Sequence, residues 1–330
     1  MSISVYRPEV FQGNLSKKNY FEGWYFKHVS KDLEHVYSFI PGVSLTGNNP
    51  HSFIQIINGI TGKTDYLTYS LKEFSWDKKS FAVRVGKSVF TGSHIDLNID
   101  KDGIQVKGRL AYRNSVKYPK RLFSPGIMGW YSFIPFMECK HGIVSVNHDI
   151  EGEIEINGNS VDFSQGKGYI EKDWGTSFPE AWIWMQANNF ADHNTSFNFS
   201  VAKIPWMGKF FVGFIAFLYV NKKFYLFSSY NNSKMISLNH SVDSVDITLE
   251  NHSSILKIKA VKNTFGELIA PVSGDMSRRI KESVDSEIVL DLFDRGGNLI
   301  CHDSSLRAGL EVIEKIFEYV SEANPPKKNK

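Results

Sequence analysis

Carboxylates beside indole rings are the residues of this chain best suited to chemistry. A carboxyl group among indoles is poorly solvated, which raises its pKa and lets it act as an acid near neutral pH. Indole faces also stabilise cations. An acid in an aromatic box therefore suits a reaction through a carbocation, such as the protonation of an alkene. The carboxylates in such surroundings are Glu22, Glu138, Glu171 and Asp173.

A purely structural role for each carboxylate is an alternative of equal weight. Salt bridges at strand ends also perturb carboxylates, so a suggestive setting is not proof of catalysis. Asp173 has two lysines within reach along the chain, Lys172 and Lys167.

The stretch 166–190 positions the strongest of these groups, and it reads as two strands with a break at 175–179. Side chains of a strand alternate between its two faces. The first strand therefore has Tyr169, Glu171 and Asp173 on one side. The opposite side carries Ile170, Lys172 and Trp174.

The second strand of this stretch carries two indoles followed by two amides on one side: Trp182, Trp184, Gln186 and Asn188. An apolar wall with a few placed polar groups is typical of a ligand pocket. The alternative, which base rates favour for an isolated strand, is a buried aromatic strand with its amides at a wet rim.

Several classes of enzyme are excluded by missing motifs. The chain has no GxSxG elbow, no P-loop and no GxGxxG after a strand. It has no CxxC and no HxxxH. His141 and His148 are seven residues apart and would face opposite sides of a continuous strand, so no metal site is predicted.

Charge and apolar runs indicate the setting. The net charge of +3, with acids and bases interspersed, does not indicate a nucleic-acid partner. The two cysteines, Cys139 and Cys301, suggest no disulfide framework. Residues 1–10 lack the pattern of a signal peptide, and the longest apolar run, 210–220, is about half the length of a membrane helix. We therefore expect a cytoplasmic protein, with a peripheral membrane contact left open.

Strands with one wet face dominate the pattern. Apolar residues alternate with polar ones over 95–100, and the turn 100–103 leads into a second alternating strand. Another hairpin is predicted around Asn157-Gly158. The irregular segment 118–135 is rich in apolar residues, so we expect it to pack over or into something. Helical spacing over 310–320 predicts one short helix, followed by a disordered tail at 325–330.

A degenerate internal repeat divides the chain. Trp24-Tyr25-Phe26 lies 14 residues before Ser38-Phe39, and Trp182-Ile183-Trp184 lies 14 residues before Ser196-Phe197. We therefore predict an all-β protein with two lipocalin-like antiparallel β-barrel or sandwich units. The N-terminal unit is placed at 1–165, and the C-terminal unit, with the short helix and the tail, at 166–330.

Five long blocks of the chain resemble the tocopherol cyclase family. They are FEGWYFK (21–27), HSFIQI (51–56), PGIMGWYSFIPFMECKHGIVSVNH (125–148), GYIEKDWGTSFPEAWIWMQANNF (168–190) and IPWMGKFFVGFIAFL (204–218). The blocks are rich in Trp and Pro and span both halves. The match weakens after residue 220, although AGLE (308–311) fits. Without a plastid-type transit segment, the chain resembles the bare cyclase-like domain, as in a bacterial member.

The resemblance implies an enzyme of the isomerase class that cyclises a hydrophobic small molecule. The family's named activity closes a chromanol ring on a prenylated hydroquinone. The alkene nearest the ring is protonated, and the phenolic oxygen attacks the tertiary cation. The resemblance implies that no cofactor and no metal is needed.

On this interpretation the acid is sought first at Glu171 and Asp173 and second at Glu138. The expected substrate-binding residues are Trp174, Trp182 and Trp184 along the cation path, Gln186, Asn188 and His148 around the phenol, and Trp24, Trp130 and Tyr131. The alternative from another class is a non-catalytic, lipocalin-like carrier of isoprenoids or lipids. A bare structural module is a third.

Overall fold

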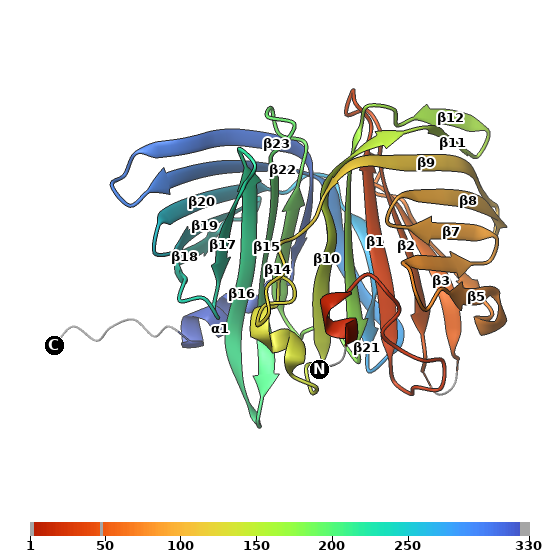
Figure 1. The fold of residues 1–330 in the computed structure, drawn as a ribbon, viewed down its shortest axis with the longest axis horizontal. Coiled ribbons are helices and arrows are strands. Elements are labelled where there is room, and N and C mark those ends of the chain that lie inside the picture. The colour runs from red at the N-terminus through yellow and green to blue at the C-terminus, as the bar shows by residue number, and fades with distance from the viewer. Residues whose placement is uncertain (1–2, 47–48, 324–330) are drawn as a thin grey trace. The chain divides into compact units, whose positions relative to one another are not determined.

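The computed structural model describes residues 3–46 and 49–323, which form two compact units, each centred on a large antiparallel sheet (Figure 1). One unit comprises Met1–Phe178 and Gly266–Arg279, and the other comprises Pro179–Phe265 and Ile280–Lys330. The predicted all-β class is confirmed, including the short C-terminal helix α1 (Ile316–Ala323). Residues 166–178, which the sequence-based boundary assigned to the second unit, group with the first. The predicted tail at 325–330 lies outside the described residues.

The first unit contains a sheet of 13 strands in the order β4-β3-β2-β1-β13-β10-β9-β8-β7-β6-β5, with the hairpin β11–β12 attached to β9. In Figure 1, β7, β8 and β9 run across the direction of β1 and β2, so the sheet folds over on itself. The strands are β1 (Phe21–Val29), β2 (Val36–Ser44), β3 (His51–Asn58), β4 (Thr64–Tyr69), β5 (Phe74–Trp76), β6 (Ala82–Val85), β7 (Ser88–Thr91), β8 (His94–Lys101), β9 (Ile104–Val116), β10 (Cys139–Glu151), β11 (Glu153–Ile156), β12 (Asn159–Asp162) and β13 (Lys167–Gly175).

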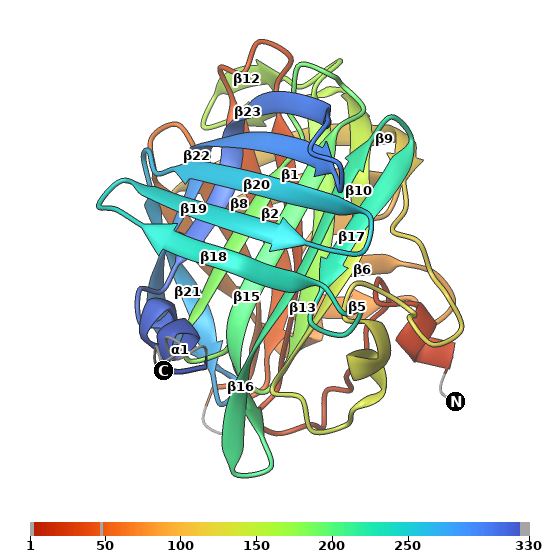
Figure 2. The same cartoon turned by 90° about the vertical axis from the view of Figure 1, so that its left-hand side faces the viewer.

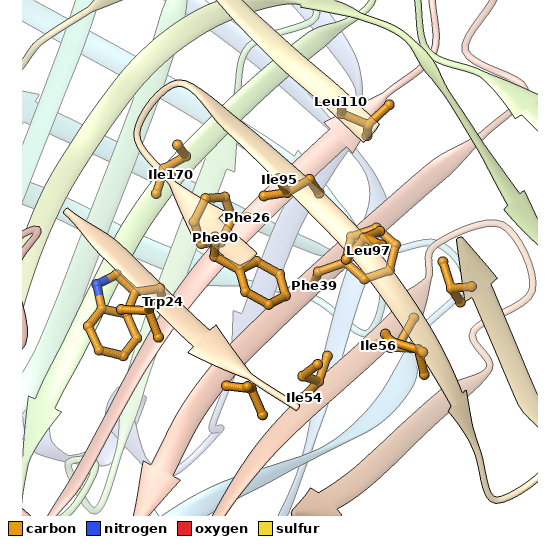
Figure 3. Packing of buried hydrophobic residues seen from close by; sticks show 14 of the residues in the cluster. Trp24, Phe26, Phe39, Ile54, Ile56, Phe90, Ile95, Leu97, Leu110 and Ile170 are labelled. Carbon is orange, nitrogen blue, oxygen red and sulfur yellow. The ribbon is translucent and has the colours of Figure 1, made fainter. Parts of the chain in front are cut away.

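The core of the first unit lies between the two crossing halves of this sheet. Trp24 and Phe26 of β1 pack in one cluster with Phe90 of β7 and Leu97 of β8, as Figure 3 shows. These side chains are at most 3% exposed. Burying a large apolar side chain stabilises a fold by about 1.5–3 kcal/mol, so the cluster holds the two halves of the sheet together.

Two predicted hairpins are confirmed, and their turns explain why they were readable. Asp102 and Gly103 join β8 to β9 with φ of 52° and 80°, and Asn157 and Gly158 join β11 to β12 with φ of 49° and 84°. Two-residue turns with positive φ at both positions favour Asn, Asp and Gly, and they match the twist of the flanking strands. The local sequence therefore carries the information for both hairpins.

A segment remote in sequence completes the first unit. It consists of β21 (Gly266–Val272) and the first residues of β22 (Asp275–Asp294). The Ile269 backbone N–H donates to Gln55 Oε1 at 2.8 Å, and Ser44 Oγ donates to the Gly274 carbonyl at 2.7 Å. Because this segment returns from the second half of the chain, a single linear boundary could not have described the unit.

The second unit is built on the strand order β17-β16-β15-β14-β23-β22-β20-β19-β18. In Figure 2, β18, β19 and β20 run across β15 and β16. The core of this unit is an apolar cluster that includes Ile183, Phe199 and Leu290. The strands are β14 (Trp182–Ala187), β15 (Ser196–Trp206), β16 (Lys209–Val220), β17 (Lys223–Ser228), β18 (Lys234–His240), β19 (Ser244–Glu250), β20 (Ser254–Val261), β22 and β23 (Leu299–Val312).

The internal repeat aligns strands whose faces are inverted. Trp24 points into the core of its unit, whereas the core of the second unit receives Ile183 and Met185 and not Trp182. A one-residue shift moves every side chain of a strand to the other face. Trp24 and Trp182, which the repeat aligns, therefore point to opposite faces of their strands.

The segment 118–135 is irregular, as predicted, apart from the 3-10 helix η3 (Gly129–Phe133). Tyr118, Ile127 and Met128 are buried, which fits the expectation that it packs onto the unit. Leu122 and Phe123, however, are 66% and 70% exposed. The remaining helical turns are η1 (Ile3–Tyr6) and η2 (Leu71–Glu73). Within the described ranges, no helix has the length and apolar character of a membrane-spanning segment.

Candidate functional site

Strand β13 lies between β1 and β10 and presents two different faces. Ile170 belongs to the core cluster, and Trp174 packs against it, so we call this side the core face. Tyr169, Glu171 and Asp173 lie on the opposite side, here called the outer face. This division follows the predicted alternation. The antiparallel register sets His141 of β10 directly opposite Asp173.

The outer face gathers four polar side chains into one cluster. His141 Nδ1 lies 2.9 Å from Asp173 Oδ1, and His141 Nε2 lies 3.7 Å from Glu171 Oε2. The Tyr169 hydroxyl donates to Glu171 Oε2 at 2.6 Å. Tyr169 and Glu171 are 0% and 4% exposed. The imidazole therefore lies between two carboxylates, and one of them also holds a phenol.

Burial sets the protonation of the neighbours of these carboxylates. Burial, and then the charge of Glu171, raise the pKa of Tyr169 well above its usual value, so its phenol stays protonated and donates. Burial and the charge of Asp173 likewise raise the pKa of the Cys139 thiol, whose Sγ lies 3.8 Å from Asp173 Oδ1. A neutral thiol is a poor nucleophile, which argues against a cysteine-based mechanism.

The geometry of His141 suits proton transfer. A carboxylate that accepts the Nδ1 proton of an imidazole fixes its tautomer and stabilises the imidazolium that forms when Nε2 takes a proton. Asp173 occupies this position, and Nε2 faces Glu171. His141 Nε2 and Glu171 Oε2 are therefore placed side by side, 3.7 Å apart, with Asp173 orienting the imidazole.

The same three residues also meet a first condition for a metal site. One ligand atom each of His141, Glu171 and Asp173 lies within 4.8 Å of the other two. Two ligands of one zinc ion at about 2.1 Å are at most about 4.2 Å apart, so the group would have to contract around such an ion. Imidazole with two carboxylates is a donor set that fits a divalent cation.

The core face of β13 holds a different charged pair. Lys172 and Glu22 form an ion pair, and both side chains are 0% exposed. Lys172 Nζ also donates to the carbonyls of Pro8 at 2.8 Å and Val10 at 2.5 Å. Its ammonium lies 4.7 Å from the ring centre of Trp24 and 4.8 Å from that of Trp174.

The Glu22 carboxylate also has several hydrogen-bond donors around it. Its carboxylate accepts the backbone N–H groups of Gln12 at 2.8 Å and Gly13 at 3.0 Å and the Tyr20 hydroxyl at 2.5 Å. Buried charges that are paired and fully hydrogen-bonded are a structural device. This pair fastens the N-terminal segment to the sheet. The alternative in which Lys172 or Lys167 neutralises Asp173 is wrong, because Lys172 pairs with Glu22 and Lys167 with Asp149.

A second buried network crosses the core face at His148. His28 Nε2 lies 2.7 Å from the Tyr112 hydroxyl, and the rings of Tyr112 and His148 have centroids 4.2 Å apart. Ser145 Oγ lies 2.9 Å from His148 Nδ1. Burial lowers the pKa of His148 well below its usual value, and that of His28 to about 3. Both imidazoles are therefore neutral.

The structure divides the predicted site residues among several places. Glu171 and Asp173 come together with His141, which the sequence reasoning had set aside. Trp24 and Trp174 flank Lys172 on the core face, and His148 joins the histidine network there. Glu138 is exposed, and Trp130 is 43% exposed and stacks on Tyr131 at 4.1 Å.

The remaining predicted residues lie on β14 of the second unit, except Asn188, which directly follows it. The two indoles and two amides share one face and are at most 6% exposed, with the apolar face of the strand turned to the core. Trp182 Nε1 donates to Glu311 Oε2 at 2.5 Å, and Gln186 Nε2 donates to Asn188 Oδ1 at 3.2 Å. The predicted site residues thus belong to two different units, and a role in binding for those of the second unit stays a prediction.

A cavity of about 380 Å³ opens in the first unit near the start of β10. It is lined by Glu9, Phe81, Gly92, Lys117, Tyr118, Lys120, Ile143 and Val144. Ile143 is the register partner of Glu171, so the cavity borders the strand pair that carries the outer-face cluster. Its size lies within the usual range for small-molecule sites, about 300–1,000 Å³.

Comparison with known proteins adds a family context. A family model described as tocopherol cyclase-like matches residues 109–313, a range that includes β10, β13 and the outer-face cluster. A probable chloroplastic tocopherol cyclase of Oryza sativa subsp. japonica is 36% identical over 63 residues, and a chloroplastic tocopherol cyclase of Zea mays is 37% identical over 62. Each match covers 19% of this chain and only 13% of the relative.

Solved structures of similar fold are more distant in sequence. CghA with Sch210972 has a TM-score of 0.53 at 10% identity, covering 89% of this chain and 88% of that one. A putative AttH from Nitrosomonas europaea has a TM-score of 0.50 at 12% identity, covering 88% and 91%. Kievitone hydratase from Nectria haematococca has 0.50 at 10% identity, covering 92% and 93%. At these identities the likeness concerns the fold.

Proposed function

The chain belongs to the tocopherol cyclase-like family, and from that premise we propose that it closes a chromanol-type ring on a prenylated hydroquinone or a similar amphipathic isoprenoid. The observation that carries the proposal is the outer-face cluster of β13. There Glu171 receives a hydrogen bond from Tyr169 and faces an imidazole held by Asp173.

The proposed reaction is an isomerisation in which protons and electrons balance. The alkene takes a proton, a carbon–oxygen bond forms between the tertiary cation and the phenolic oxygen, and the phenol O–H bond breaks. One proton is consumed and one is released. The reaction therefore requires an acid and a base, but no oxidant or reductant.

Glu171 is the proposed acid. Once its proton has moved to the alkene, its carboxylate accepts the Tyr169 hydroxyl and faces His141. The Tyr169 hydroxyl stabilises the charged form more than the protonated form, so it favours the proton transfer itself and not merely substrate binding. Tyr169 remains a donor throughout, because burial raises its pKa.

His141 is the proposed base. Asp173 holds its Nδ1, so Nε2 is the nitrogen that accepts the phenolic proton. Glu171 Oε2 lies 3.7 Å from Nε2, a separation that a small movement or one water molecule closes. The proton then returns to Glu171, and the cluster is ready for another turnover.

Chromanol formation in deuterated water tests this assignment. The wild-type protein, given a prenylated hydroquinone, should place solvent deuterium on the ring carbon next to the tertiary carbon that bonds the phenolic oxygen. Glu171→Gln should still bind the quinol but lose turnover by about 100-fold or more, the usual value of a general acid. Glu138→Gln, which changes an exposed carboxylate, is the matched control and should turn over normally.

Three other results would redirect the proposal. Binding of several prenyl quinols without any deuterated product would favour the carrier. Loss of turnover in Glu138→Gln alone would move the acid to Glu138. Loss of turnover after dialysis against a chelator, with recovery on adding a divalent ion, would make His141, Glu171 and Asp173 metal ligands.

A further inference from the structure

Apolar side chains stand exposed on the loop from Lys117 to Glu138. Leu122, Phe123, Trp130 and Phe136 are 66%, 70%, 43% and 59% exposed. Single exposed apolar residues are normal, but several large ones on one short segment mark a surface that another body covers. All four belong to the first unit.

The loop is held in place, so its exposed residues are presented on a defined platform. Ile127 and Met128 are buried and anchor its middle. The Tyr6 hydroxyl donates to the Leu122 carbonyl at 2.5 Å, and Lys120 Nζ donates to the Tyr6 carbonyl at 2.6 Å. A β-bridge joins Arg121 to Ser124, so Leu122 and Phe123 form the tip of a tight turn.

Basic residues flank this apolar tip along the chain. The stretch 117–140 contains Lys117, Lys120, Arg121 and Lys140 and a single carboxylate, Glu138. Lys17 of the N-terminal segment lies near enough that its charge, after burial, lowers the pKa of Lys140. Glu9 lies 3.7 Å from Lys120 and offsets one of these charges, so the surface combines protruding apolar side chains with a smaller excess of positive charge.

We propose that this loop docks the protein on the surface of a lipid bilayer that contains anionic lipids. Leu122 and Phe123 enter the boundary between headgroups and acyl chains, while Arg121 faces the phosphates. Apolar and aromatic side chains next to Lys and Arg are the composition of interfacial membrane anchors. Charge complementarity selects an anionic bilayer, because each cation near such a surface is attracted to it.

The loop also borders the cavity of the first unit. Lys117, Tyr118 and Lys120 belong to the loop and line the cavity. Docking through the loop would bring this cavity to the bilayer surface, where a prenylated quinol is dissolved. This last step rests on the proposed function, whereas the docking itself does not.

Vesicle co-sedimentation of the whole protein tests the docking. We expect binding to vesicles of phosphatidylcholine and phosphatidylglycerol in equal parts, and at least tenfold weaker binding to phosphatidylcholine alone. Raising the salt from about 0.05 M to about 0.5 M should weaken binding, since free ions screen the attraction. Leu122→Ser/Phe123→Ser and Arg121→Glu should each reduce binding about tenfold or more, because apolar burial and charge act together.

A matched control separates this surface from apolar exposure in general. Val242 and Leu299 are 86% and 56% exposed but lie outside the loop. Val242→Ser/Leu299→Ser should bind vesicles as the wild type does, and circular dichroism should show all variants folded. Brominated lipids should quench tryptophan emission in the wild type, and Trp130→Phe should remove most of that quenching.

Three outcomes overturn the proposal. The first is that the wild type binds neither kind of vesicle, and the second is an equal loss of binding in the loop variant and the control. The third is a wild-type dimer that Leu122→Ser/Phe123→Ser makes monomeric without any change in vesicle binding, which would assign the surface to a second copy. Turnover of a short-chain quinol in solution should be normal in the loop variant, so failure of docking and failure of the proposed cyclase are distinguishable.

Discussion

The two faces of β13 differ in how their buried ionisable groups are combined. On the core face, one cation meets one carboxylate, and each is surrounded by further hydrogen-bonding groups from the N-terminal segment. On the outer face, one imidazole lies between two carboxylates. A matched pair has nothing to exchange, whereas an imidazole between two carboxylates shares protons with them. The numbers of positive and negative groups, more than their burial, distinguish the core face from the outer face that we propose to be reactive.

The largest expected effect is on the core face. Lys172→Met leaves Glu22 buried without its cation, which should lower the free energy of unfolding by about 3–5 kcal/mol. Urea denaturation followed by tryptophan fluorescence measures this loss. His141→Asn on the outer face should cost less, because the Asp173 side chain is 23% exposed and can be hydrated. If both substitutions cost the same, the contrast between the faces fails.

The next effect is catalytic and belongs to the outer face alone. Glu171→Gln should reduce the rate of ring closure by about 100-fold, or about 2.7 kcal/mol in the activation barrier, with little change in quinol binding. Single-turnover kinetics separates the two quantities. A variant that loses binding and rate in proportion would show that Glu171 holds the substrate and does not protonate it.

A smaller effect should follow from Tyr169→Phe. It removes the hydroxyl that donates to Glu171 Oε2 at 2.6 Å and leaves the ring in place. A hydrogen bond to a charged group contributes about 1.5–3 kcal/mol, so the rate should fall by about 10-fold to 100-fold. The pH profile is the second readout. The pH dependence of the rate should differ from that of the wild type, since the hydroxyl that favours the charged carboxylate is gone.

The smallest expected effect, counted per pH unit, is the loss of folding stability that acid causes through the histidines of the core face. Folding lowers the pKa of His28 from the usual 6.5 to about 3 and that of His148 in the same direction. The unfolded chain therefore binds more protons below pH 6.5, and stability falls as the pH drops from there towards 3. Each histidine contributes a slope of up to about 1.4 kcal/mol per pH unit.

Urea denaturation at several pH values below 6.5 measures this slope. His28→Gln keeps a polar group near Tyr112 and should reduce the slope. His302→Gln is the control, because that side chain is 61% exposed and pairs with Asp291 at the surface. An unchanged slope in His28→Gln would contradict the assignment of acid sensitivity to the core face.

Local patterns allowed much of this architecture to be predicted. The alternation over 95–99 and the turns at Asp102-Gly103 and Asn157-Gly158 are recorded in neighbouring residues, because pleat and turn geometry act over a few positions. The division of β13 into two faces followed from the same period. That Glu171 and Asp173 share a side was therefore readable from the sequence.

Only the tertiary structure decided which partners these carboxylates meet. His141 lies 32 residues before Asp173, and Lys172 lies 150 residues after Glu22, so strand order and register bring them together. Two irregularities in β10 shift its register along β13, and no local pattern marked them. The sequence determined that β13 would offer acids on one side and a lysine on the other. Long-range pairing decided that the lysine would be neutralised in the core and the acids would share an imidazole.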